Sequence, residues 1–237
     1  MARLIVALDY PEKEPALAMA RALQGSGAMV KVGLELYTRE GPDVVRALRD
    51  LGLPVMLDLK FHDIPNTVKG AVRSACALDA EIVTVHLSGG ERMIRAAAEG
   101  AAEGAAHYGT HAPMLFGITV LTSLAPGELP GISGDLGAFA VSLARSAALW
   151  GASGVVCSGH EAAAIKAACP SLLALTPGIR PAGGSTAGDQ RRIMTPAQAV
   201  AAGSDYLVVG RPITKAADPA SAARAILAEM AASAGRS

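Results

Sequence analysis

Acidic and basic side chains are concentrated in the segment 58–67, Asp-Leu-Lys-Phe-His-Asp-Ile-Pro-Asn-Thr. The segment continues an apolar run, and residues two apart on a strand point to the same face. Asp58 and Lys60 should therefore lie side by side, with Asp63 just beyond them in the turn. Neighbouring carboxylates favour a protonated ammonium, so Lys60 suits a general acid better than a Schiff-base nucleophile. A salt-bridge network that only stabilises the fold is the alternative that this spacing leaves open.

Other polar side chains stand at the ends of apolar runs: Asp9, Lys31, His86, Thr122, Arg180 and Arg211. The carboxyl ends of parallel barrel strands share one face, which carries the active site in barrel enzymes. We therefore expect these side chains to converge on one mouth. His86 is expected to be hydrogen-bonded inside the barrel rather than to bind a metal, because neither it nor His62 has further ligands at a suitable spacing.

Gly210 and Arg211 follow the last apolar run, where barrels often bind phosphate. Glycine lets a backbone N–H approach an oxyanion, and the arginine fork matches phosphate geometry. The alternative is a glycine at a helix start beside a surface arginine.

Eight apolar runs would position these residues. Most are rich in Val, Leu and Ile without polar alternation, which is typical of buried parallel strands. They are Leu4–Asp9, Met29–Gly33, Val55–Lys60, Ile82–Leu87, Met114–Leu121, Gly154–Ser158, Leu172–Ile179 and Tyr206–Arg211. Alanine-rich helical segments separate them, and Thr195-Pro196 and Asp218-Pro219 are typical helix starts. Eight strand-helix units predict a (β/α)8 TIM barrel that forms one domain over residues 1–237. A doubly wound open sheet is the alternative, since periodicity does not show closure.

Composition excludes several classes of protein. The 21 basic and 21 acidic residues give no net charge, so neither a nucleic-acid nor a membrane surface is expected. No apolar stretch approaches the roughly 18 residues of a membrane helix. The three cysteines lack a CxxC spacing, which argues against a disulfide framework or zinc site and favours the cytoplasm.

The chain resembles a known family. The segment 58–67, DLKFHDIPNT, is similar to the signature of orotidine 5′-monophosphate decarboxylases, most of all to the bacterial branch. Five other segments match in order: LDY at Asp9, KVG at Lys31, TPGIRP from Thr176, GDQRRIMTP from Gly188 and VGRPIT from Val209. The resemblance implies a TIM barrel that converts orotidine 5′-monophosphate to UMP without metal or cofactor.

The resemblance also implies a role for each matching residue. The residue matching Lys60 protonates C6 of the pyrimidine, and the one matching Asp58 lies against the departing carboxylate. Those matching Asp63 and Thr67 come from the partner subunit of a homodimer. The remaining matches are substrate-binding residues: Asp9 and Lys31 at the ribose, Thr122 at the pyrimidine, Gln190, Gly210 and Arg211 at the phosphate, and Arg180 at the ligand. The loop that carries Gln190 matches the family's closing lid.

Two rival functions remain open. Related barrels, such as hexulose-phosphate synthase and ketogulonate-phosphate decarboxylase, use Mg²⁺ and carry Glu at the second strand end, where this chain has Lys31. A lysine there repels a divalent cation. The second rival is a non-catalytic barrel that senses a nucleotide, which need not keep Asp58, Lys60 and Asp63 together.

Overall fold

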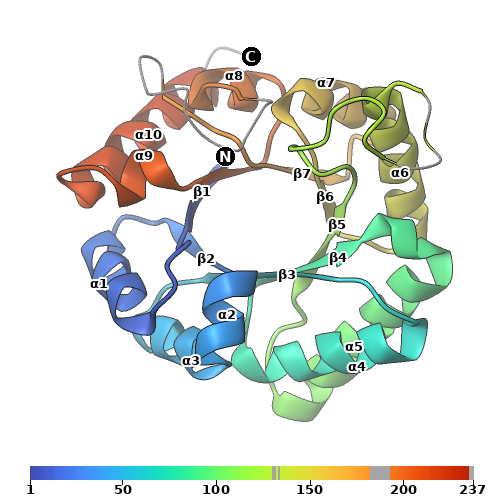
Figure 1. Cartoon of the computed structure of the whole chain (residues 1–237), viewed down its shortest axis with the longest axis horizontal. Helices are drawn as coiled ribbons and strands as arrows, with labels where there is room; N and C mark the ends of the chain where they lie inside the picture. Colours follow the sequence, from blue (N-terminus) through green and yellow to red (C-terminus); the bar gives the residue numbers. More distant parts are fainter. Residues whose placement is uncertain (130–131, 133, 182–192, 235–237) are drawn as a thin grey trace.

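A closed barrel of eight parallel strands forms the centre of the protein. The computed structural model describes residues 1–129, 132, 134–181 and 193–234. Neighbouring strands follow chain order and β1 closes the ring on β8 (Figure 1), so that Val6 faces both Val30 and Val209. The strands are β1 (Arg3–Ala7), β2 (Met29–Gly33), β3 (Val55–Phe61), β4 (Ile82–His86), β5 (Met114–Ile118), β6 (Gly154–Val156), β7 (Leu173–Thr176) and β8 (Tyr206–Val209). The predicted TIM barrel is confirmed, and the open-sheet alternative is wrong.

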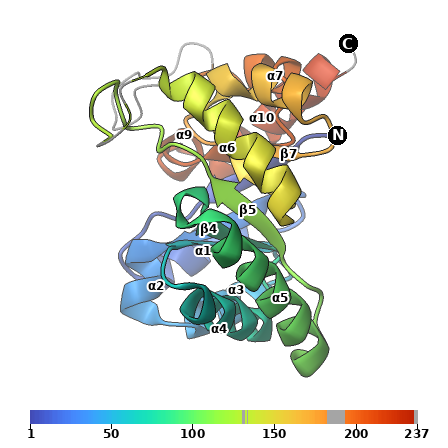
Figure 2. The ribbon, with the colours of Figure 1, turned by 90° about the vertical axis from the view of Figure 1, so that its right-hand side faces the viewer.

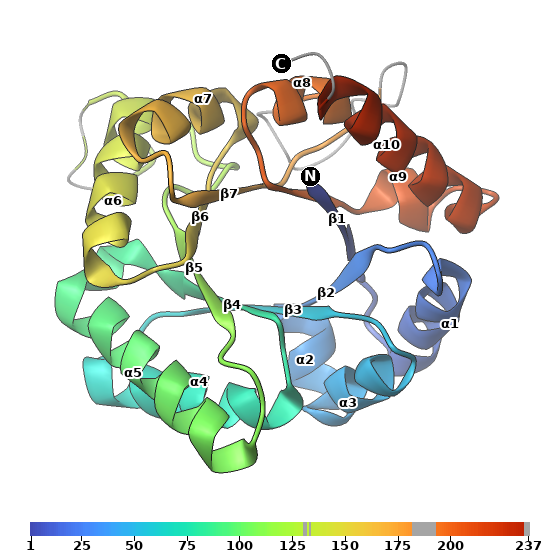
Figure 3. The same ribbon diagram turned by 180° about the vertical axis from the view of Figure 1, so that it is seen from behind.

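Helices surround the barrel, as the views from the side and from behind show (Figures 2 and 3). The α-helices within the described residues are α1 (Lys13–Leu23), α2 (Leu34–Glu40), α3 (Asp43–Asp50), α4 (Pro65–Ala75), α5 (Gly90–Tyr108), α6 (Leu136–Trp150), α7 (Gly159–Ala168), α8 (Pro196–Ala201), α9 (Arg211–Thr214) and α10 (Pro219–Ala234). In the part of the chain that is described, none of them has the length and apolar character needed to cross a bilayer.

Local side chains begin these helices as the sequence predicts. The Thr195 hydroxyl accepts from the backbone N–H of Gln198, whose side chain in turn accepts from the N–H of Thr195. The Asp218 carboxylate accepts from the N–H of Ser221 at the start of α10. Such contacts satisfy backbone donors that have no partner inside the helix.

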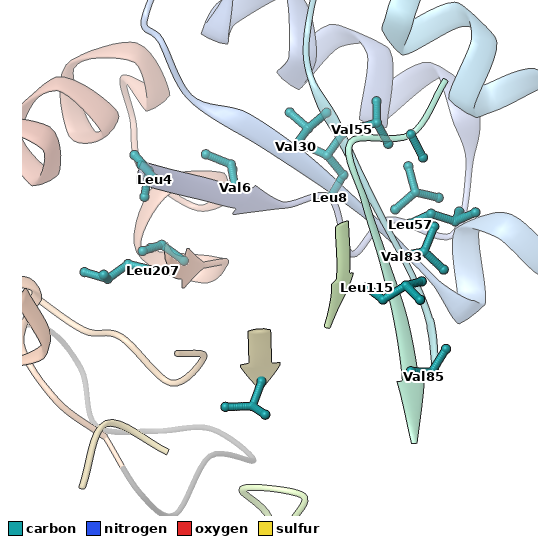
Figure 4. Packing of buried hydrophobic residues seen from close by; sticks show 14 of the residues in the cluster. Leu4, Val6, Leu8, Val30, Val55, Leu57, Val83, Val85, Leu115 and Leu207 are labelled. Carbon is teal, nitrogen blue, oxygen red and sulfur yellow. The ribbon is translucent and has the colours of Figure 1, made fainter. Parts of the chain in front are cut away.

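Two apolar layers hold the barrel together. Strand residues that point outwards pack against the helices; Figure 4 labels Val6, Val30, Leu57 and Val83 among them. Residues that point inwards fill the barrel interior and include Ile5, Met29, Met56, Ile82, Phe116 and Tyr206. Alternate residues of a strand face opposite sides, and both sides here are apolar, because the sheet is covered inside and out.

The carboxyl end of β3 departs from regular strand geometry. Its register with β4 shifts between Leu57, which pairs with Val83, and Phe61, which pairs with Val85. Within this bulge Lys60 has a positive φ of 52°. A left-handed conformation costs a residue with a side chain roughly 1–2 kcal/mol and persists where the surroundings impose it.

Candidate active site

A cavity of about 610 Å³ opens at the carboxyl ends of the strands. Its inner wall is apolar and includes Ala7, Met56, Ile118, Val156, Leu175 and Val208. Its polar lining includes seven of the residues that the sequence predicted for the site: Asp9, Lys31, Asp58, Lys60, Thr122, Arg180 and Arg211. Gly210 lines it as well. The prediction that the strand ends converge on one mouth is confirmed for these residues.

Four charged side chains form an alternating array on one side of this cavity: three come from β2 and β3, and the fourth, Asp9, follows β1. The Lys60 Nζ donates to Asp58 Oδ2 at 2.9 Å. The Lys31 Nζ lies 3.5 Å from the same Asp58 oxygen and donates to Asp9 Oδ1 at 3.0 Å. Each ammonium thus touches at least one carboxylate, and Lys31 bridges two of them.

Burial and charge act in opposite directions on the inner members of the array. Burial lowers the pKa of Lys31, but the charges of Asp58 and Asp9 outweigh it and leave the pKa above its usual value. Burial likewise raises the pKa of Asp58, and the charges of Lys31 and Lys60 outweigh it and leave that pKa below its usual range. Lys31 and Asp58 therefore both stay charged at neutral pH, although each is largely removed from solvent.

Asp63 and Thr67 do not line the cavity of their own chain, and both are exposed. The strand ends at Phe61, and the turn into α4 points the Asp63 carboxylate towards the backbone N–H of Ile64, 2.6 Å away. No ion pair joins Lys60 to Asp63 among the described residues. The expectation from spacing that Lys60 lies between Asp58 and Asp63 of the same chain is therefore wrong.

Two arginines stand at another part of the rim, at the ends of β7 and β8. Burial lowers the pKa of Arg180, and the positive charge of Arg211 lowers it further. Within the described part of the chain neither guanidinium forms an ion pair with a carboxylate. The backbone of Gly210 lies beside Ala7, the last residue of β1, and Asp9, which follows this strand. The predicted residue Gln190 lies outside the described residues.

His86 does not line the cavity that the described residues form. Its ring packs on that of His62, with the centroids 5.4 Å apart. Burial lowers the pKa of His86, and the charges of His62 and Lys60 lower it further. His86 is the last residue of β4, as expected, and η2 (Leu87–Gly89) follows it directly, but its side chain does not join the residues that line the cavity. Among the described residues His86 makes this ring contact and not the expected hydrogen bond.

The comparisons with known proteins agree with the geometry of this site. Residues 2–226 match the model of the "Orotidine 5'-phosphate decarboxylase / HUMPS family". The chain belongs to this family. An orotidine 5′-phosphate decarboxylase of Nitratidesulfovibrio vulgaris strain DP4 is 65% identical over 98% of this chain and 99% of its own. One of Lawsonia intracellularis is 53% identical over 92% and 95%. The crystal structure of the Lactobacillus acidophilus orotidine 5′-phosphate decarboxylase superposes with a TM-score of 0.86 at 36% identity, covering 97% of this chain and 99% of that one.

Some residues that line the cavity were not predicted from the sequence. They include Tyr10 and Ser123, which directly follow named residues, and Lys215, which follows α9. Burial raises the pKa of the Tyr10 hydroxyl, so it stays protonated at neutral pH. The signal that could have found them is adjacency, because Tyr10 comes directly after Asp9 and Ser123 directly after Thr122.

No cluster of three or more His, Cys, Asp or Glu side chains suited to a metal ion occurs within the described residues of this family member. Among the described residues, Asp9 and Asp58 are the carboxylates that line the cavity, and the Lys31 ammonium bridges them. All three cysteines are buried.

Proposed function

We propose that this chain decarboxylates orotidine 5′-monophosphate to UMP in pyrimidine biosynthesis, with Lys60 as the proton donor to C6. The main support is the position of the Lys60 ammonium, whose Nζ lies 2.9 Å from Oδ2 of the buried Asp58 carboxylate at the edge of the cavity. The named relatives, which are orotidine 5′-phosphate decarboxylases at up to 65% identity, support the choice of substrate.

The chemistry explains why an ammonium is needed. Cleavage of the bond between C6 and the carboxylate releases CO₂ and leaves the electron pair on C6, in the plane of the ring. The ring offers that pair no delocalisation, so fixed positive charge must stabilise it. Lys60 then transfers one N–H proton to C6, which gives UMP and a neutral amine that solvent reprotonates.

Asp58 has two parts in this proposal. Its carboxylate holds the ammoniums of Lys60 and Lys31 in place through Oδ2. We also propose that it faces the departing carboxylate of the substrate. Asp9 and Lys31 are proposed to contact the ribose and Thr122 the pyrimidine, since all three line the same cavity.

The arginine side of the cavity suits a phosphate. Arg180 and Arg211 repel each other there, and a dianion between them would relieve the repulsion and accept charge-assisted hydrogen bonds. We assign the phosphate to Arg211, the Gly210 backbone and Gln190, with Arg180 as a further ligand contact. Binding energy from this remote group can be used to align C6 with Lys60.

Replacement of Arg211 by alanine should therefore lower kcat/KM by roughly ten- to a hundredfold, the effect of losing hydrogen bonds to a charged group. Steady-state kinetics with orotidine 5′-monophosphate measure it. Arg224→Ala is the matched control, because Arg224 lies on α10 and contacts Ser221 outside the cavity. Equal kinetics for the two variants would remove Arg211 from the phosphate site.

A homodimer that completes each site is the second part of the proposal. A second hollow of about 160 Å³, beside α2, also reaches Asp9, Lys31, Asp58 and Lys60. The array is thus accessible from a side other than the large mouth. Leu34 lines this hollow and is 54% exposed, and Ile64, next to Asp63, is 67% exposed. Apolar side chains exposed beside a charged site suit a subunit interface, through which Asp63 and Thr67 would enter the partner's site.

Conversion of orotidine 5′-monophosphate to UMP should persist with EDTA present, because the Lys31 ammonium stands between the two carboxylates where a divalent cation would bind. The change in ultraviolet absorbance follows the reaction directly. Loss of activity in EDTA, regained with Mg²⁺, would favour the sugar-phosphate rival. Binding of UMP without any conversion would favour the non-catalytic barrel. We propose the cytoplasm as the site of the reaction, in keeping with three cysteines that lack a CxxC spacing.

A further inference from the structure

One buried hydroxyl on β4 contacts both halves of the proposed proton-donor pair. Thr84 is 0% exposed and lies between Val83 and Val85, in an otherwise apolar stretch of strand. Its Oγ1 donates to Asp58 Oδ1 at 3.0 Å. The same Oγ1 accepts from the backbone N–H of Lys60 at 2.9 Å. Neither contact belongs to the backbone ladder of the barrel.

The direction of these hydrogen bonds is fixed by chemistry. A hydroxyl has a single proton, and the backbone N–H of Lys60 can only donate. The proton of Thr84 must therefore point to Asp58, which is ionised and can only accept. With Oδ1 held by Thr84 and Oδ2 by the two ammoniums, the carboxylate has one orientation.

The second contact supports the unusual backbone of Lys60. In the bulge of β3, residues 58–60 lie opposite Thr84 alone, because Leu57 pairs with Val83 and Phe61 with Val85. The Lys60 N–H is bonded there by a side chain, at the residue whose φ is 52°. A non-glycine residue keeps such a conformation where its neighbours impose it.

We infer that Thr84 is a positioning residue, whose one hydroxyl sets both the orientation of the Asp58 carboxylate and the backbone conformation from which the Lys60 side chain reaches Asp58. The inference rests on the proposed function, because it assigns Thr84 a part in placing the proton donor. Thr84 itself is buried and is not among the residues that line the cavity.

The test replaces Thr84 by Val, which keeps the shape and removes the hydroxyl, and by Ser, which keeps the hydroxyl. Thr84→Val should lower kcat by about ten- to a hundredfold, with KM within about threefold of wild type, since a misplaced donor affects the transition state more than binding. Thr84→Ser should recover kcat to within about threefold. Thr176→Val is the matched control: Thr176 is also buried on a strand and bonded to a hydroxyl, that of Ser204, but does not line the cavity.

The dependence of kcat on pH separates positioning from a loss of stability. The groups around Asp58 are Lys31 on β2, Lys60 on β3, Thr84 and His86 on β4 and, through Lys31, Asp9 after β1. The Thr84 hydrogen bond lowers the pKa of Asp58, so its removal raises that pKa. The acid limb of kcat should therefore move to higher pH in Thr84→Val and return in Thr84→Ser.

Wild-type kcat and an unmoved acid limb in Thr84→Val would overturn the inference, and so would an equal loss of kcat in Thr176→Val. If Thr84→Val does not fold, Thr84→Cys tests the inference in its place, because the cysteine thiol has a similar volume but is a weaker hydrogen-bond donor than the hydroxyl. An intermediate kcat would support positioning, and wild-type kcat would refute it. Failure of the wild-type protein to convert orotidine 5′-monophosphate would instead remove the proposed function itself.

Discussion

Lys60→Ala is expected to lower kcat by a factor on the order of 10⁴, because the variant loses both the proton donor and the fixed charge that stabilises the carbanion. The methyl group that remains can neither donate a proton nor carry charge. Asp58 then keeps Lys31 as its one ammonium partner among the described residues. Single-turnover and steady-state assays with orotidine 5′-monophosphate measure the loss.

The control for this variant is Lys69→Ala. Lys69 lies on α4, where its ammonium pairs with Glu99 and Glu103 of α5, and its removal should leave kcat unchanged. Binding of UMP by Lys60→Ala shows that the cavity is intact. Near-normal turnover in Lys60→Ala with UMP still bound would end the claim that Lys60 is the proton donor.

Mixing inactive Lys60→Ala and Asp63→Ala proteins is expected to regenerate roughly a quarter of the wild-type activity once subunits have exchanged. Random exchange makes about half of the dimers hybrid, and one of the two sites in each hybrid has both residues intact, as follows for a two-fold symmetric dimer. The exposed position of Asp63, away from the cavity of its own chain, is the structural ground for this expectation.

A second mixture supplies the control. Lys60→Ala and Asp58→Ala should not complement each other, because Asp58 and Lys60 are in direct contact within one chain. Every hybrid site then lacks one of them. Native mass spectrometry confirms that hybrids have formed. Hybrids without activity in the first mixture, or with activity in the second, would contradict the shared site.

The fold could be predicted from the sequence because its signals are local and repeated. Eight apolar runs, with helix starts such as Thr195-Pro196 between them, record burial on both faces of a strand. The predicted ends of the strands were less accurate. The run from Met114 was expected to reach Leu121, whereas β5 ends at Ile118. Apolar residues continue beyond the ladder there because they line the cavity, and composition does not separate a strand from the wall that follows it.

The sequence predicted which residues belong to the candidate site better than it predicted how they are arranged. Asp9, Lys31, Asp58, Lys60 and Arg211 all line the cavity, because each stands at a strand end and parallel strands end at one face. His86 stands at such an end too, yet its ring packs on His62. Thr84 gave a weaker signal, a single polar residue in an apolar strand, and only its contacts with Asp58 and Lys60 show what it does.

The sequence by itself determined the barrel, its order and the types of charge gathered at its mouth, since periodicity and residue chemistry are properties of short segments. Tertiary structure alone decided that Lys31 bridges Asp9 and Asp58 and that Lys60 adopts a left-handed backbone. It also decided that the Asp63 carboxylate accepts from the backbone N–H of Ile64 and does not line the cavity of its own chain. The physical reason is that side chains alternate between the two faces of a strand only as far as its backbone hydrogen bonds to the neighbouring strands continue. Beyond that point the direction of a side chain depends on neighbours from other strands.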